Sequence, residues 1–179
     1  QWGVGKPIQN SFALISAHPS LADKTIKLGL QEEDYLATNS DLQTVLLTDM
    51  NAYDRATIGV DVEDLAPGYD LGAGNITFYP SYKSGHDVVV GSQNNISMLG
   101  TLKNSENEPL ALQVGEARCI DEQAAEPYLF FTSKTGRFAL TGLKPCQYQI
   151  VLKDVSHEPL IIEIDEKQQL HNKGVIYVH

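Results

Sequence analysis

Thr132-Ser-Lys-Thr-Gly-Arg-Phe-Ala-Leu-Thr-Gly-Leu-Lys-Pro-Cys-Gln-Tyr148 decides the fold class of this chain. Gly136 can adopt the positive φ of a tight turn without steric cost. Phe138 and Leu140 then alternate with smaller or charged residues, which is the period of two of a β-strand. Pro145 falls in a second turn, after which apolar residues return at every second position. The stretch predicts a turn, a strand, a second turn and another strand, arranged as a β-hairpin.

Strand signals of the same kind recur along the chain, separated by Gly, Pro, Asn and Asp, and a sustained helical apolar period is missing. This pattern predicts an all-β sandwich fold. Gly115 is expected to form a bulge in a long strand, and Pro67 and Gly68 are expected to fill the centre of a type II turn. The remaining expected strands are residues 12–16, 24–28, 44–48, 56–62, 76–79, 87–90, 96–102, 110–120, 128–132, 160–164 and 174–178.

A polar stretch, Gly91-Ser-Gln-Asn-Asn95, marks an expected domain boundary, after which the strand pattern restarts. We therefore predict two tandem β-sandwich domains, residues 1–91 and 92–179, of the immunoglobulin-like or transthyretin-like kind. No internal sequence repeat relates the two halves. Residues 1–90 carry five Lys/Arg against twelve Asp/Glu, whereas residues 91–179 carry eight against eleven. A basic partner should therefore be attracted more strongly to the first half.

Composition argues against several classes of function. The net charge of −10, without a Lys/Arg cluster, argues against nucleic acid and anionic membrane surfaces as partners. No apolar run approaches the roughly 20 residues of a membrane helix, so no membrane insertion by this chain is expected. The start at Gln1 lacks a signal-peptide pattern, which favours a processed chain or an excised fragment over a cytosolic protein.

Catalytic, cofactor and metal sites are not predicted. The five histidines are dispersed and no Cys/His cluster with metal-ligand spacing exists. Ser84, His86 and Asp87 are adjacent in sequence, but a catalytic triad is defined by geometry and there is no G-x-S-x-G motif. The carboxylates between Asp61 and Asp64 fit a solvated strand face better than a calcium loop. We expect a non-enzymatic protein.

Cysteine and tyrosine are the informative residue types. Cys119 and Cys146 permit one disulfide or two free buried thiols, and their spacing leaves both open. Tyr53, Tyr79 and Tyr82 lie in or beside loops of the first half, where tyrosines often anchor protein interfaces. The competing interpretation is that each ring caps an edge of the sandwich. With Lys83, which follows Tyr82, these tyrosines are the candidate partner-binding residues.

Two resemblances add to this interpretation. The second half resembles the carboxypeptidase-regulatory or transthyretin-like β-sandwich, through Gly100-Thr-Leu, Pro109-Leu-Ala-Leu, Phe131-Thr-Ser-Lys-Thr-Gly136, Gly142-Leu-Lys-Pro and Tyr148. The first half resembles the C-terminal region of outer-membrane fimbrial ushers, most closely the archaic or alternative branch. The motifs that carry this second resemblance are Gly5-Lys-Pro-Ile-Gln-Asn-Ser-Phe-Ala-Leu-Ile15, His18-Pro-Ser-Leu21, Pro67-Gly-Tyr-Asp-Leu-Gly-Ala-Gly74 and Tyr82-Lys-Ser-Gly85.

The usher resemblance implies two periplasmic domains that follow the β-barrel and plug of one parent chain at the outer membrane. It implies binding of periplasmic chaperone–pilus-subunit complexes during polymerisation and secretion, with no catalytic residues. Cys146 stands where the family's turn usually has glycine, so the resemblance implies a disulfide with Cys119 in an oxidising periplasm. The alternatives are a structural spacer or stalk of a secreted or cell-surface protein, and an accessory domain of a peptidase.

Overall fold

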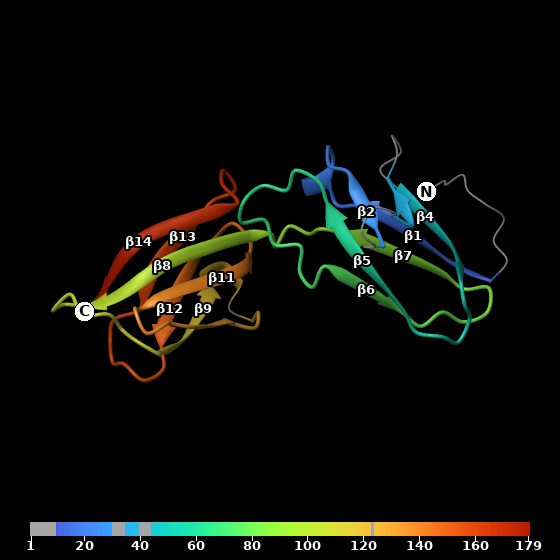
Figure 1. The fold of residues 1–179 in the computed structure, drawn as a ribbon. Coiled ribbons are helices and arrows are strands. Elements are labelled where there is room, and N and C mark those ends of the chain that lie inside the picture. Colours follow the sequence, from blue (N-terminus) through green and yellow to red (C-terminus); the bar gives the residue numbers. More distant parts are fainter. Residues whose placement is uncertain (1–9, 30–34, 40–43, 123) are drawn as a thin grey trace. The chain divides into compact units, whose positions relative to one another are not determined.

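The computed structural model describes residues 10–29, 35–39, 44–122 and 124–179 of the chain, and these residues are almost entirely β-structure (Figure 1). They form two compact units. Unit 1 comprises Gln1–Leu65 and Leu71–Gln93, and unit 2 comprises Ala66–Asp70 and Asn94–His179. Within the described residues, none of the helices is long and apolar enough to cross a membrane. The fold class predicted from the strand pattern is confirmed.

Unit 1 contains a three-stranded and a four-stranded sheet. In the first, β1 lies in the centre, antiparallel to β4 and parallel to β7. In the second, the order is β3-β2-β5-β6 and all pairs are antiparallel. The bounds are β1 Ser11–Ala17, β2 Ile26–Leu28, β3 Ala37–Thr38, β4 Thr44–Met50, β5 Ala56–Val62, β6 Asn75–Phe78 and β7 Gly85–Val90, with a 3-10 turn at Pro19–Leu21.

Unit 2 has a three-stranded sheet of order β11-β8-β14 and a four-stranded sheet of order β10-β9-β12-β13. The central strand β8 is antiparallel to β11 and parallel to β14. The bounds are β8 Ile96–Asn104, β9 Val114–Cys119, β10 Tyr128–Phe131, β11 Arg137–Leu143, β12 Cys146–Leu152, β13 Leu160–Ile164 and β14 Leu170–Val178, with a 3-10 turn at Ile120–Glu122. The alternating inward residues of both sheets form one buried hydrophobic cluster.

The two units share one topology. If β1 to β7 are matched in order with β8 to β14, the sheet orders β4-β1-β7 and β3-β2-β5-β6 become β11-β8-β14 and β10-β9-β12-β13. In each unit the first strand is central and parallel to the last strand. The two units therefore repeat one fold, although no sequence repeat relates the two halves of the chain.

The predicted hairpin over Thr132–Tyr148 is wrong. Its two strands, β11 and β12, belong to opposite sheets: β11 pairs with β8, whereas β12 pairs with β9 and β13. The turn between them is a corner at which the chain crosses from one sheet to the other. Tyr148 fixes this corner, because its hydroxyl donates to the Lys144 carbonyl oxygen (3.1 Å) and accepts from the Lys144 N–H (3.2 Å). Burial of this ring raises the pKa of Tyr148 to about 12.

Other expectations about single elements have mixed outcomes. Gly136 and Gly68 have positive φ values of 75° and 84°, as predicted, and the Tyr69 N–H closes the expected turn on the Ala66 carbonyl. The strand expected from residue 110 begins at Val114. The strand expected from residue 174 begins at Leu170. The short strand β3 was not expected.

The expected bulge at Gly115 is also wrong. Gly115 pairs in register with Phe130 on one side and Leu152 on the other. A Cβ atom at Gly115 would lie 2.2 Å from Cζ of Phe130, so the glycine provides room for this ring. The same relation holds for three paired positions, which are Gly115 with Phe130, Gly100 with Phe138 and Gly85 with Phe12.

Candidate functional site

The four candidate partner-binding residues lie in two connections at one end of unit 1. Tyr53 lies in the β4–β5 connection, whereas Tyr79 and Tyr82 lie in the β6–β7 connection. Figure 1 shows both connections at the same end of this unit. They are joined by a hydrogen bond from the Tyr53 N–H to the carbonyl oxygen of Pro80, at 2.7 Å. We call Tyr53, Tyr79, Tyr82 and Lys83 the tyrosine end.

The three rings of the tyrosine end face solvent. The exposed fractions are 84% for Tyr53, 70% for Tyr79 and 57% for Tyr82. The ammonium group of Lys83 lies 5.3 Å from the ring centroid of Tyr82, within cation–π range. More than half of the surface of each of these three residues is thus accessible to a partner.

The backbone beneath these rings is fixed by hydrogen bonds. Ser84 donates to the Ser81 carbonyl through both its N–H (3.0 Å) and its hydroxyl (2.8 Å). The Ser11 hydroxyl in β1 donates to the same carbonyl at 3.1 Å. Tyr53 and Lys83 have φ values of 62° and 57°, a conformation that costs free energy for residues other than glycine. The hydrogen bonds therefore fix the backbone from which the three tyrosine side chains project.

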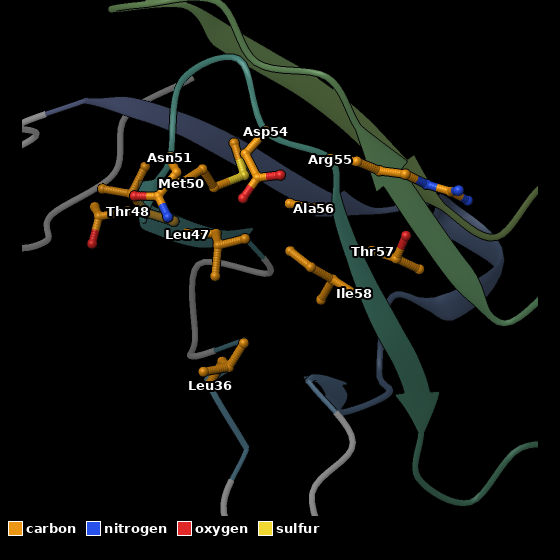
Figure 2. Close-up of a pocket in the computed structure, with 11 residues that line it drawn as sticks. Leu36, Leu47, Thr48, Met50, Asn51, Asp54, Arg55, Ala56, Thr57 and Ile58 are labelled. Atoms are coloured by element: carbon orange, nitrogen blue, oxygen red, sulfur yellow. The ribbon is translucent and has the colours of Figure 1, made fainter.

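A groove of about 750 Å³ lies beside the tyrosine end (Figure 2). Its apolar floor includes Leu47 and Met50 of β4 and Ile58 of β5, and Leu36 stands at its side with 70% of its surface exposed. Asn51 and Asp54 at its upper rim belong to the same connection as Tyr53. The sequence did not indicate this groove, because its apolar residues have the same alternation as those that fill the core.

Cys119 and Cys146 form a disulfide in unit 2, with their Cα atoms 5.8 Å apart. It links the end of β9 to the start of β12. Asp121 lies next to it, with Oδ2 3.9 Å from the Cys146 sulfur. Within the described ranges, these three residues are the one grouping of at least three metal-ligating side chains. Disulfide sulfurs are not the thiolates that bind metal ions, so the grouping does not offer a metal site in this oxidised form.

Ser84, His86 and Asp87 do not assemble into a triad. The Ser84 hydroxyl lies 3.3 Å from Nε2 of His86. His86 and Asp87 are consecutive residues of β7, and consecutive residues of a strand point to opposite faces. Asp87 is therefore not placed to orient the His86 ring, as the third member of a triad would be.

Ion pairs on the two units shift carboxyl pKa values. The Lys153 ammonium (2.8 Å) and then the Arg118 guanidinium (3.2 Å) lower the pKa of Glu116 on unit 2. On unit 1, Lys27 pairs with Glu63, which lowers the pKa of Glu63 and raises that of Lys27. Both carboxylates are partly exposed to solvent, so these pairs add little stability.

No protein-family model matches this chain, and no curated protein matches it by sequence. Among solved structures, it is similar to a chain of the Escherichia coli P pilus tip assembly intermediate PapC-PapD-PapK-PapG, with a TM-score of 0.50 and 10% identity. The match covers 96% of this chain and 20% of that chain, so this chain spans a fifth of its length.

Two pilins of Gram-positive bacteria are also similar. The shaft pilin SpaA of Lactobacillus rhamnosus GG matches with a TM-score of 0.39 and 11% identity, over 96% of this chain and 97% of that one. The minor pilin GBS52 of Streptococcus agalactiae matches with a TM-score of 0.38 and 9% identity, over 94% and 95%. At these identities the similarities concern the fold alone. The two-sandwich fold of this chain is thus one that also occurs in a pilus assembly intermediate.

Proposed function

We propose that this chain is a non-catalytic binding module of a pilus-assembly usher. In this role it receives and holds chaperone–subunit complexes at the periplasmic side of a bacterial outer membrane during polymerisation and secretion. The usher-like motifs in the first half support the proposal, as does a fold shared with the P pilus assembly intermediate over 96% of the chain. The β-barrel and plug of the same parent chain would be its other neighbours.

The observation that carries the proposal is the tyrosine end. It offers three exposed aromatic rings on two loops that are tied together by the Tyr53–Pro80 hydrogen bond. Tyrosine side chains bind protein partners at low entropic cost, because each has few rotatable bonds to order on binding. The acidic excess of the first half would attract a partner with a basic surface and increase the association rate.

A second candidate function is a structural spacer or stalk. The observation that favours it is the repeated topology, because tandem copies of one sandwich suit an extended array. Only the usher role requires Tyr53, Tyr79 and Tyr82 to contact a partner, so substitution of these residues separates the two candidates.

The test is a binding titration with purified chaperone–subunit complexes from pilus systems with archaic or alternative ushers. We expect saturable binding to the wild-type chain, weakened at least about tenfold by the triple substitution Tyr53→Ser, Tyr79→Ser and Tyr82→Ser. Tyr177→Ser is the matched control, because Tyr177 is an exposed tyrosine of unit 2. Absence of binding at high micromolar concentration would contradict the usher role. Equal binding by the triple variant would contradict the role of the tyrosine end.

A further inference from the structure

The disulfide of unit 2 borders a surface pocket of about 670 Å³. Cys146 contributes to the lining of this pocket, whereas Cys119 does not. The pocket therefore adjoins the disulfide on the side of Cys146, and both cysteines are mostly buried, with 8% of Cys146 and 7% of Cys119 exposed. Among the described residues, those that line it are Asp121, Pro145, Cys146, Gln147, Glu163, Ile164, Asp165 and Glu166.

Half of these lining residues are acidic, and none of them is Lys or Arg. We call Asp121, Glu163, Asp165 and Glu166 the carboxylate collar. Oδ2 of Asp121 lies 3.9 Å from the Cys146 sulfur. A carboxylate this close to a reacting sulfur repels an approaching anion, and the other charges around the pocket add to this repulsion, more strongly at low ionic strength.

Basic residues adjoin the collar without lining the pocket. Lys144 forms an ion pair with Glu122, which is itself outside the lining. The ammonium group of Lys173 donates to the backbone carbonyl of Glu163 at 2.7 Å. Lys167 donates its backbone N–H to Asp165, and its side chain is exposed. His171, which is buried, has Nε2 3.7 Å from the Asp165 carboxylate. Because none of these basic residues lines the pocket, the residues that do line it carry four formal negative charges.

We propose that Cys119–Cys146 is a thiol–disulfide exchange site that reacts preferentially with cationic and neutral thiols and resists anionic ones. A thiolate attacks the sulfur of Cys146, the bond between the two protein sulfurs breaks, and Cys119 leaves as a thiolate that takes a proton from water. A second thiolate then attacks the reagent sulfur of the mixed disulfide and releases Cys146 as a thiolate. Two reagent thiols are oxidised to a disulfide while one protein disulfide is reduced. This inference does not depend on the proposed pilus function.

The experiment measures reduction of the folded chain by cysteamine, 2-mercaptoethanol and 3-mercaptopropionate, whose side groups are cationic, neutral and anionic. Each rate is divided by the thiolate concentration. It is then divided by the rate at which the same thiol reduces bis(2-hydroxyethyl) disulfide, an uncharged reference, which corrects for the intrinsic nucleophilicity of each thiol. At about 10 mM ionic strength we expect the protein to favour cysteamine over 3-mercaptopropionate about tenfold more than the reference does. At 1 M salt, where the Debye length falls to about 3 Å, this preference should largely disappear.

A double variant that neutralises two collar carboxylates, Asp121→Asn with Glu166→Gln, should lose most of the preference. The matched control is Glu106→Gln with Glu158→Gln, which removes two exposed charges of unit 2 that do not line the pocket. A native chain that discriminates no more than the reference would overturn the proposal, as would a double variant with full preference. Rates independent of thiol concentration would also overturn it, because reduction would then follow unfolding. The salt dependence of the native chain tests the same charges if the double variant does not fold.

Discussion

Substitution of Gly115 by alanine should destabilise unit 2 through a single contact. Gly115 pairs directly with Phe130 across β9 and β10, and an alanine Cβ atom would lie 2.2, 2.4 and 2.9 Å from three atoms of that ring. Ordinary contact needs well over 3 Å, so the ring has to move by about 1 Å or more. Phe130 is buried against Phe138, with ring centroids 5.0 Å apart. Movement of the Phe130 ring therefore disturbs the packing of the hydrophobic core of unit 2.

We expect Gly115→Ala to reduce the free energy of unfolding of unit 2 by about 3 kcal/mol, at the upper end of typical overpacking costs. Gly115 does not have a positive φ, so backbone strain should not add to this value. The assay is urea denaturation combined with hydrogen exchange, read from amides of β9 and β10. Exchange reports unit 2 separately, which is necessary because a chain of two units need not unfold in one step.

A double-mutant cycle with Phe130→Leu isolates the contact. Phe130→Leu alone is destabilising, but Gly115→Ala added to it should cost less than about 1 kcal/mol, since the obstructing ring atoms are absent. The coupling free energy between the two sites should then be about 2 kcal/mol. If Gly115→Ala lowered the free energy of unfolding equally in both backgrounds, the space beside Gly115 would not be what accommodates the Phe130 ring.

Four further outcomes are expected. Tyr148→Phe should lower the stability of unit 2 by about 1–2 kcal/mol in urea denaturation, because two backbone groups lose the hydroxyl as a partner. Replacing Cys119 and Cys146 by serine opens a loop with a sequence separation of 27, and chain entropy predicts a loss of about 3.5 kcal/mol, measurable by the same method. Because the pKa of Glu116 is lowered below its ordinary value of 4.5 in the folded state, its contribution to stability is present above that pH and is lost as the pH falls through the folded pKa. Lys153→Gln should raise the Glu116 pKa in an NMR titration of its carboxyl group, and an unchanged pKa would show that Arg118 suffices.

The sequence predicted the strands well because the signals for strands are local. The alternation of Phe138 and Leu140 and the turn at Pro145 depend only on neighbouring residues. Which strands pair is a long-range property, and here the local pattern suggested the wrong partners. A tight connection between β11 and β12 fits a hairpin and a corner between sheets equally well until the positions of β8 and β9 are known.

Gly115 shows the same limit at a single position. A glycine inside a strand pattern suggests a bulge, and nothing near it in the sequence indicates otherwise. The glycine is explained by Phe130, which lies fifteen residues later in the sequence and directly opposite Gly115 in the sheet. The Gly100–Phe138 pair is more distant still in sequence. Such pairs become predictable only once the strand register is known.

The candidate site was predictable in its residues and not in its geometry. Tyrosines in polar loops of the first half stand out in the sequence, and the structure leaves their rings exposed. The convergence of Tyr53 with Tyr79 and Tyr82 depends on a backbone hydrogen bond to Pro80, about which residue type carries no information. The groove was hidden for a different reason, since Leu47 and Ile58 look the same whether they face a core or a surface hollow.

Because the two units share one topology, their equivalent connections can be compared, and these differ in the side chains that they present. In unit 1 the tyrosine end is built from the β4–β5 and β6–β7 connections. The equivalent connections of unit 2, β11–β12 and β13–β14, contribute Pro145, Asp165 and Glu166 to the pocket beside the disulfide. One end of the same scaffold thus presents exposed aromatic rings in one unit and a carboxylate-lined disulfide in the other. The two units keep one strand order although this end differs between them, so the strand order does not require either set of residues. We therefore expect substitutions at these connections to change what each unit binds or reacts with more than they change its stability, in contrast to Gly115 and Tyr148 in the core.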